Sequence, residues 1–314
     1  MNFRIGKNLF LLLVVSVPVW SQTTRTIAIT IDDLPVVSTR RDLKTRQQIT
    51  RKILANIAKA KVPVIGFVNE NQLYAGDKRD EKKVDLLRQW LAAGLELGNH
   101  TYSHNSLNQI SLADYEADFL KGETITKELL ASKGRPIRFF RHPYLQTGRT
   151  MQIKADFDIF LREHGYTIAP ITFDNADYIF SRAYDIAFDK GDKKLMKKIG
   201  DAYVPYMESK LAYWERQSVR VFGREMRQTL LIHANFINSD YLGHLIAMFK
   251  RRGYKCVDLE TALKDEAYRL PDTYIGPAGI SWLHRWTLEK GKSFIEPNEP
   301  TVPKFVTKIA GMTE

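Results

Sequence analysis

The chain has 314 residues, of which 44% are hydrophobic and 26% are charged. This length and composition predict a globular protein with a sizeable core, in one large domain or two small ones, and exclude an intrinsically disordered chain. The formal net charge of +11 favours anionic neighbours such as wall polymers, lipid headgroups or nucleic acid. The basic residues are scattered, however, and no nucleic-acid-binding motif accompanies them, so we expect no nucleic-acid partner.

The first residues have the pattern of a secretion signal. Arg4 and Lys7 precede an apolar run over residues 9–19, and a cleavage-site pattern ends at Ser21. The run is about half of the ~20 residues that a membrane-spanning helix needs, so a cleaved signal peptide over residues 1–21 is favoured over an uncleaved anchor. We therefore expect an exported protein, periplasmic or secreted, with no stable membrane span after cleavage.

Strand and helix patterns alternate along most of the remaining chain. Apolar, β-branched stretches predict strands at 26–31, 64–68, 95–99, 137–141, 166–173, 229–233 and 254–257. Three-to-four spacing of apolar residues predicts helices at 43–61, 82–93, 112–132, 155–164, 183–215 and 241–251. Seven or so such repeats predict an α/β fold, a deformed (β/α) barrel of about seven strands over residues 22–270. Residues 271–314 lack the alternation and are rich in proline, which predicts a C-terminal extension packed on the barrel.

Metal-capable side chains follow two of the predicted strands. Asp32 and Asp33 end the first strand, where one carboxylate can bind a metal while the other accepts a proton. His100 and His104 follow the third strand, and histidines four apart in a helical turn share one face, as a pair of zinc ligands requires. Each signal has a structural alternative, because an Asp pair before proline is typical of a turn and a histidine pair at this spacing arises by chance.

Three more polar groups follow later strands. Arg141 precedes a Pro-containing turn with Tyr144 and can orient a carboxylate, although a surface salt bridge is an equal alternative. The segment 174–178 begins with Asp174, which could instead cap a helix, and the apolar strand that ends at His233 could carry a structural histidine. The common placement of all five groups after strands favours one active site at the carboxyl end of a barrel.

In this order the five groups resemble the motifs of the polysaccharide deacetylases, the NodB-homology family also called carbohydrate esterase family four. The family motifs T-F-D-D, H-[S/T]-x-x-[H/D], R-x-P-Y, D-x-x-D-W and L-x-H correspond to Thr30-Ile31-Asp32-Asp33, His100-Thr101-Tyr102-Ser103-His104, Arg141-His142-Pro143-Tyr144, Asp174-Asn175-Ala176-Asp177-Tyr178 and Leu231-Ile232-His233. The resemblance spans about residues 26–265.

The sequence departs from the family pattern in three places. Ile31 and Leu34 replace the usual Phe and Gly around the Asp pair, and Tyr178 replaces the usual Trp. A long, Lys-rich insertion over residues 179–228 exceeds a minimal family member. None of these changes removes a metal ligand, but the insertion predicts a different cleft shape and substrate.

The resemblance implies a role for each site residue. Asp33, His100 and His104 would hold a divalent metal, most simply Zn²⁺, with Co²⁺, Mn²⁺ or Ni²⁺ as alternatives. Asp32 would be the catalytic base, held ionised by Arg141, and His233 would be the acid, kept protonated by Asp177. The backbone of Tyr144 would stabilise the oxyanion, while Tyr178 and Leu231 would line the acetyl pocket.

The resemblance also implies a function, namely metal-dependent removal of N- or O-linked acetyl groups from an acetylated glycan such as peptidoglycan or a chitin-like or xylan-like polymer. Two alternatives stay open. The same motifs encode acyl transfer without specifying the leaving group, so the chain could be an amidohydrolase of a small non-sugar amide. It could also be a non-catalytic protein that binds the cell wall.

Overall fold

The computed structural model describes residues 25–40, 42–291 and 298–314. The predicted signal peptide over residues 1–21 lies outside this part of the chain. Within the described residues, no helix has the length and apolarity needed to cross a membrane.

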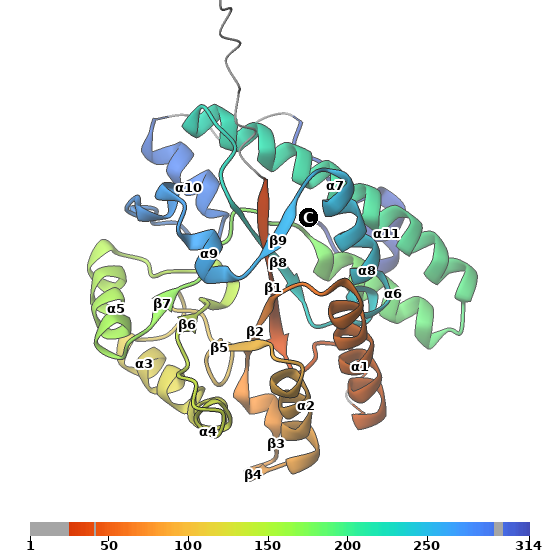
Figure 1. Ribbon diagram of the computed structural model, residues 1–314, viewed down its shortest axis with the longest axis horizontal. Coiled ribbons are helices and arrows are strands. Elements are labelled where there is room, and N and C mark those ends of the chain that lie inside the picture. The colour runs from red at the N-terminus through yellow and green to blue at the C-terminus, as the bar shows by residue number, and fades with distance from the viewer. Residues whose placement is uncertain (1–24, 41, 292–297) are drawn as a thin grey trace, which may run out of the picture.

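A parallel sheet forms the centre of the molecule, and helices surround it (Figure 1). Its strands run in the order β7-β6-β5-β2-β1-β8, and β9 pairs with the beginning of β1. Their bounds are β1 Thr26–Leu34, β2 Val64–Val68, β5 Glu96–Asn99, β6 Phe139–Phe140, β7 Thr167–Ile168, β8 Gln228–His233 and β9 Lys255–Val257. The prediction of an α/β fold with a deformed barrel of about seven strands is confirmed.

The central strands β1, β2 and β8 are buried along nearly their whole length, as expected for parallel strands covered on both faces. In the pairing of β1 with β8, Asp32 lies directly opposite His233. Two residues from sequence-distant motifs are therefore neighbours because of strand register alone.

The segment after β7 links the far edge of the sheet back to β8. Ala169 donates its backbone N–H to the Phe140 carbonyl at 2.8 Å, and four residues later Phe173 forms a bridge with Leu230 of β8. The sheet therefore curls round, although β6 and β7 are only two residues long.

The helices lie between the strands in chain order, with a two-stranded antiparallel hairpin of β3 (Tyr74–Ala75) and β4 (Lys78–Arg79) after the second strand. Their bounds are α1 Leu43–Ala60, α2 Glu81–Ala92, α3 Leu112–Lys121, α4 Thr124–Ala131, α5 Met151–Glu163, α6 Asp177–Asp189, α7 Lys193–Phe222, α8 Phe236–Arg251, α9 Leu259–Leu263, α10 Trp282–Glu289 and α11 Lys304–Ala310. Single 3-10 turns cover η1 Glu70–Leu73, η2 Pro143–Leu145 and η3 Glu266–Arg269.

Two helix predictions were wrong in extent. The single helix expected over residues 112–132 is divided into α3 and α4 at Gly122, where a Cβ atom would lie 2.3 Å from the Thr101 carbonyl carbon. The single helix expected over 183–215 is divided into α6 and α7 by a turn around Gly191, which has a positive φ. Apolar spacing continues across both breaks, so periodicity alone does not reveal them.

The C-terminal segment packs against the helices α6 and α7, which contain most of the insertion. Helix α10 contacts α7, and α11 contacts α6. Trp282 and Trp286 of α10 are buried, as is Val306 of α11. Residues near both ends of the chain sequence therefore contribute to one hydrophobic core.

Candidate active site

A cavity of about 650 Å³ opens at the carboxyl end of the sheet. Eight of the ten residues predicted to form the site line it, and they are Asp32, Asp33, His100, His104, Tyr144, Tyr178, Leu231 and His233. The other two, Arg141 and Asp177, lie behind the wall and contact Asp32 and His233. The structure thus brings all ten residues to one place.

Asp33, His100 and His104 form a cluster that can hold a metal ion. One ligand atom from each lies within 4.8 Å of the others. The Asp33 Oδ1 atom is 3.6 Å from His100 Nε2 and 3.4 Å from His104 Nε2. That oxygen is buried and has no hydrogen-bond partner among the described residues, a condition that a bound cation would relieve. Two imidazoles and one carboxylate are a donor set that fits a catalytic divalent metal with open positions.

The histidines are in the state that a metal requires. Burial lowers the pKa of His100 well below its usual range, and the nearby His104 lowers it further. Burial also lowers the pKa of His104, although Asp33 opposes this. The Nδ1 atom of His100 lies 2.7 Å from the Arg141 carbonyl oxygen. Because a carbonyl oxygen can only accept, Nδ1 carries the hydrogen and Nε2 keeps its lone pair for a ligand.

The helical turn expected for residues 100–104 is absent from the described structure of this segment. Instead, Thr101 and His104 adopt left-handed backbone conformations with φ of 65° and 58°, and Asp33 has a φ of 62°. Such conformations cost roughly 1–3 kcal/mol each for residues with a side chain and persist only where surrounding contacts hold them. Here the Asn99 side chain accepts from the Thr101 N–H at 2.7 Å, and the Thr101 hydroxyl accepts from the His104 N–H at 3.0 Å.

Asp32 is buried beside the cluster of Asp33, His100 and His104, and only one of its two carboxylate oxygens accepts a hydrogen bond in the described structure. Arg141 donates from Nη1 to Asp32 Oδ2 at 3.2 Å, while Asp32 Oδ1 has no hydrogen-bond partner in the described structure. Burial raises the pKa of Asp32 to about 6, although the positive charge of Arg141 opposes this. Arg141 thus acts in the expected direction by lowering the pKa of Asp32, but the cost of burying the carboxylate is larger, so the net pKa is raised.

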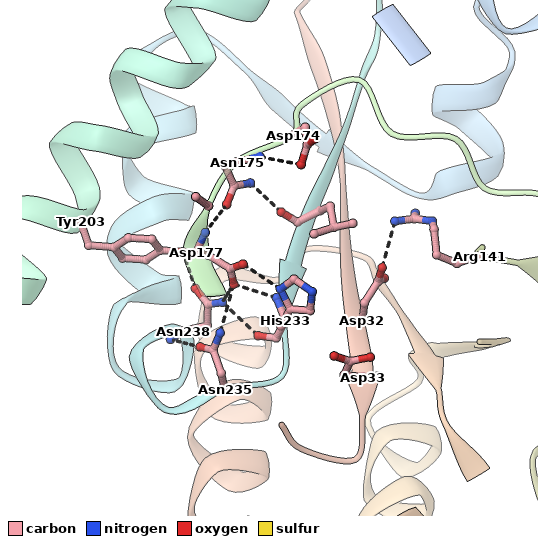
Figure 2. Close-up of polar contacts among 12 residues, drawn as sticks. Asp32, Asp33, Arg141, Asp174, Asn175, Asp177, Tyr203, His233, Asn235 and Asn238 are labelled. Carbon is pink, nitrogen blue, oxygen red and sulfur yellow. Dashed lines mark hydrogen bonds and ion pairs between the residues drawn. The ribbon is translucent and has the colours of Figure 1, made fainter. Parts of the chain in front are cut away.

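On the other side of the cavity, His233 is held by Asp177 (Figure 2). Asp177 accepts from His233 Nδ1 at 2.7 Å and from the His233 backbone N–H at 2.9 Å. Burial alone would lower the pKa of His233, but the charge and hydrogen bond of Asp177 raise it to about 10. The pKa of Asp177 is lowered because His233 and its other donors outweigh its burial.

Sequence reasoning missed two asparagines that complete this pair. Asn235 and Asn238 each donate a side-chain N–H to Asp177 Oδ2, at 3.1 and 2.7 Å. Asn235 also caps the N-terminus of α8 by accepting from the Asn238 backbone N–H at 2.9 Å. An Asn at the residue before a helix is a recognisable capping signal, but its second role depends on α6 and α8 meeting in space.

The cavity has aromatic walls and one apolar side. Tyr144 is 58% exposed and Tyr178 is 44% exposed, so both rings are available to a ligand. The Tyr144 ring packs edge-on against His104, with centroids 4.5 Å apart. Leu231 is buried and contributes an apolar surface to the same cavity.

Another part of the wall comes from segments for which the sequence offers no motif. Lys210 of α7 lines the cavity together with Glu299 and Glu314 of the C-terminal segment. The Lys210 ammonium lies 2.7 Å from Glu299 and 3.3 Å from Glu314. Asp174 lines the same end, and burial raises its pKa to about 6 against the influence of Lys210. The insertion and the C-terminal segment therefore shape the cavity directly.

Comparison with known proteins agrees with the motifs. Residues 21–168 match the family model of polysaccharide deacetylases, so the resemblance stated from the sequence is confirmed. This range contains the Asp32-Asp33 pair, the two histidines and Arg141. A search of curated proteins found no match.

Several solved structures are similar in fold at low sequence identity. A pseudoenzyme of carbohydrate esterase family four from Bacillus anthracis is 15% identical over 77% of this chain and 66% of its own, with a TM-score of 0.48. The peptidoglycan deacetylase PdaC from Bacillus subtilis is 21% identical over 77% of this chain and 93% of its own, with a TM-score of 0.47. A family 4 carbohydrate esterase from Streptomyces lividans, solved with acetate, is 16% identical over 76% of this chain and 95% of its own, with a TM-score of 0.45.

Substitution of His104 by alanine tests the metal cluster. We expect the metal-free protein to bind one equivalent of Zn²⁺ in titration calorimetry. His104→Ala should weaken binding by more than the roughly 10–100-fold that outer-sphere substitutions cost, because a ligand is lost. His164→Ala is the matched control, since His164 is exposed at the end of α5. Equal affinity of His104→Ala and the control would contradict the assignment.

The Asp177–His233 pair makes a separate prediction for the metal-free protein. Asp177→Asn should lower the pKa of His233 from about 10, because the carboxylate that most strongly opposes the effect of burial is removed. The folded pKa exceeds the usual ~6.5 of an unfolded chain. The pair therefore stabilises the fold fully between the unfolded pKa values of about 3.9 for aspartate and about 6.5 for histidine. It loses this contribution as pH rises through about 10 or falls through the lowered pKa of Asp177. NMR titration of His233 and chemical denaturation at several pH values measure both effects, and an unchanged His233 pKa in Asp177→Asn would refute them.

Proposed function

We propose that the protein is a metal-dependent hydrolase that removes N- or O-linked acetyl groups from an extracellular or cell-wall polysaccharide. The carrying observation is that one cavity combines a three-residue metal cluster with two titratable groups of opposite tendency, Asp32 and His233. The polysaccharide deacetylase match over residues 21–168 supports the same reaction. Acetylated peptidoglycan and chitin-like or xylan-like polymers are the proposed substrate class.

A divalent ion bound by Asp33, His100 and His104 would polarise the acyl carbonyl and acidify a water molecule. Zn²⁺ is the simplest choice for two imidazoles and one carboxylate, with Co²⁺, Mn²⁺ and Ni²⁺ as alternatives. The Nε2 lone pair of His100, the lowered pKa of His104 and the unpaired Asp33 oxygen support this assignment.

Asp32 would accept the proton of the attacking water. Its Oδ2 atom is fixed by Arg141 and its Oδ1 atom has no competing partner in the described structure, so one oxygen is oriented and the other is available. A pKa of about 6 leaves the group ionised at neutral pH yet basic enough to take a proton. A cation held by the neighbouring Asp33 would lower this pKa further.

His233 would give its proton to the leaving group. The water oxygen adds to the acyl carbon, and the Tyr144 backbone N–H would stabilise the negative oxygen that develops. As the carbon–nitrogen or carbon–oxygen bond breaks, the His233 imidazolium protonates the leaving amine or alkoxide. Asp177 supports this role because it accepts from the imidazole and raises its pKa, while Asn235 and Asn238 hold Asp177 in place. Acetate and the deacetylated sugar are the products.

The walls of the cavity support acetyl selection at a sugar. Leu231 offers an apolar surface suited to a methyl group, and the exposed ring of Tyr178 offers a face for a sugar ring. The pattern of residues 1–21 supports export to the periplasm or the cell exterior, where such polymers occur.

One observation favours a second candidate, hydrolysis of a small non-sugar amide. Lys210, Glu299 and Glu314 add an ion-paired wall to the cavity with side chains from the insertion and the C-terminal segment. A volume of about 650 Å³ is in the usual range for sites that take a small molecule. A non-catalytic wall-binding protein is a weaker candidate, because the groups needed for acyl hydrolysis are all gathered in one cavity.

Acetate release separates these candidates. Metal-loaded protein is incubated with acetylated chitooligomers, acetylated xylan, peptidoglycan and simple N-acetyl amides, with and without a chelator. The proposal expects chelator-sensitive acetate from at least one glycan. Release from simple amides alone would favour the second candidate, and binding to glycans without any acetate would favour the wall-binding protein.

Asp32→Asn tests the base directly. We expect kcat to fall by roughly 10²–10⁴-fold, the usual contribution of a general base, because an amide cannot take the proton. Zn²⁺ affinity, measured by calorimetry, should stay close to that of the wild type because Asp32 is not one of the three ligands. Retained turnover in this variant would remove Asp32 from the mechanism.

A further inference from the structure

The turn that carries Tyr144 has an unusual backbone. Tyr144 and Leu145 are consecutive residues with left-handed conformations, at φ of 56° and 54°. A side chain disfavours this conformation because Cβ crowds the following carbonyl oxygen. Two such residues in succession therefore need support from contacts outside the turn.

Part of that support is the close approach of Gly279. A Cβ atom at this position would lie 1.8 Å from the Tyr144 carbonyl oxygen and 2.8 Å from the Leu145 carbonyl carbon. Gly279 does not have a positive φ, so it is the lack of space that requires glycine here. At Gly279 the backbone of the C-terminal segment therefore lies closer to the turn than a residue with a side chain would allow.

Arg285 also holds the same turn, through hydrogen bonds. Its guanidinium donates from Nη2 to the Leu145 carbonyl oxygen and from Nη1 to the Thr147 hydroxyl at 3.2 Å. Its Nε atom donates to the Ile280 carbonyl at 3.1 Å, which ties the turn to the segment that contains Gly279. Arg285 is only 2% exposed, so water does not compete for these bonds.

The guanidinium is itself fixed in place. Its Nη1 atom donates to Asp272 Oδ2 at 2.6 Å, and its plane lies over the Trp282 ring, 3.9 Å from the ring centroid. Lys154 also donates to Asp272 at 2.6 Å, so this carboxylate keeps a cationic partner if Arg285 is replaced. A planar guanidinium with several donors in fixed positions is well suited to hold backbone carbonyl groups in place.

The segment 276–285, here called the clamp segment, is anchored at both ends. Gln146 donates from Nε2 to the Pro277 carbonyl at 2.7 Å beside the turn. Trp282 donates its backbone N–H to the Ile171 carbonyl at 2.7 Å, near the segment that curls the sheet towards β8. The clamp segment thus joins the turn to the sheet.

We infer that Gly279 and Arg285 are positioning residues that hold the Tyr144 backbone in the conformation required for oxyanion stabilisation. This inference rests on the proposed hydrolytic function. Both residues lie outside the range that matches the family model, so the inferred clamp belongs to the C-terminal segment of this chain. Gly279 lines the cavity and Arg285 is buried behind it, and both act on the reaction through the turn at 143–147.

Two substitutions test the clamp in metal-loaded protein. Gly279→Ala forces the turn to move because its Cβ meets backbone atoms, and Arg285→Met removes the donors to Leu145 and Thr147. We expect each to lower kcat at least tenfold, since a misplacement of ~1 Å can cost about 10²-fold, with KM and Zn²⁺ affinity unchanged. Gly243→Ala in α8 is the matched control, because its Cβ would meet only the Asn56 side chain and the residue lies outside the clamp segment and the turn.

Amide hydrogen exchange provides a readout that needs no activity. Peptides covering residues 143–147 should exchange faster in Gly279→Ala and Arg285→Met than in the wild type and Gly243→Ala, while peptides from β1 and β8 stay protected. If the wild type releases no acetate from any substrate, the proposed function fails, and exchange alone decides whether the clamp exists. Unchanged exchange in both variants, or unchanged kcat in an active enzyme, would overturn the inference. A general loss of protection and of metal affinity would also overturn it, by showing an overall packing role.

Discussion

The rest of the site depends on the hydrogen bonds of the buried Arg141 guanidinium. It is fully buried and donates to Asp32, to the Thr30 hydroxyl and to the Ala169 carbonyl. Its own carbonyl oxygen accepts from His100. A buried charge is stable only when its donors are satisfied, so the strand ends that supply these acceptors must meet around it. One residue thereby links the proposed base, a proposed metal ligand and the segment that curls the sheet.

Burial also gives the two proposed proton carriers opposite properties. Asp32 has a single charged hydrogen-bond partner, and desolvation raises its pKa to about 6. His233 has a buried carboxylate beside it, and this contact raises its pKa to about 10 in spite of desolvation. The two residues are register partners on adjacent strands, yet one is set to accept a proton and the other to donate one. Environment, more than residue type, makes this division.

Several residues that line the cavity have a strained backbone conformation, and contacts from distant parts of the chain stabilise it. Asp33, His104 and Tyr144 all have positive φ and all line the cavity. The loop that contains His104 packs closely against Gly122, which lies between two helices. The turn that contains Tyr144 packs closely against the C-terminal segment. The match to the family model ends at residue 168, so much of the support for the turn, and the wall around Lys210, comes from the remainder of the chain.

The sequence by itself determined the βα order and the deformed parallel barrel, because parallel strands place their carboxyl ends at one edge. With the family resemblance it also predicted ten site residues, which the structure brings together around one cavity. It predicted the pairing of His100 with His104 for a wrong reason, a helical turn that the left-handed loop replaces. Only the tertiary structure decided the breaks at Gly122 and Gly191, the net pKa of Asp32, the asparagines around Asp177 and the wall built by Lys210, Glu299 and Glu314. Periodicity and motif spacing report local conformation, whereas burial, desolvation and close backbone approach depend on which distant segments meet.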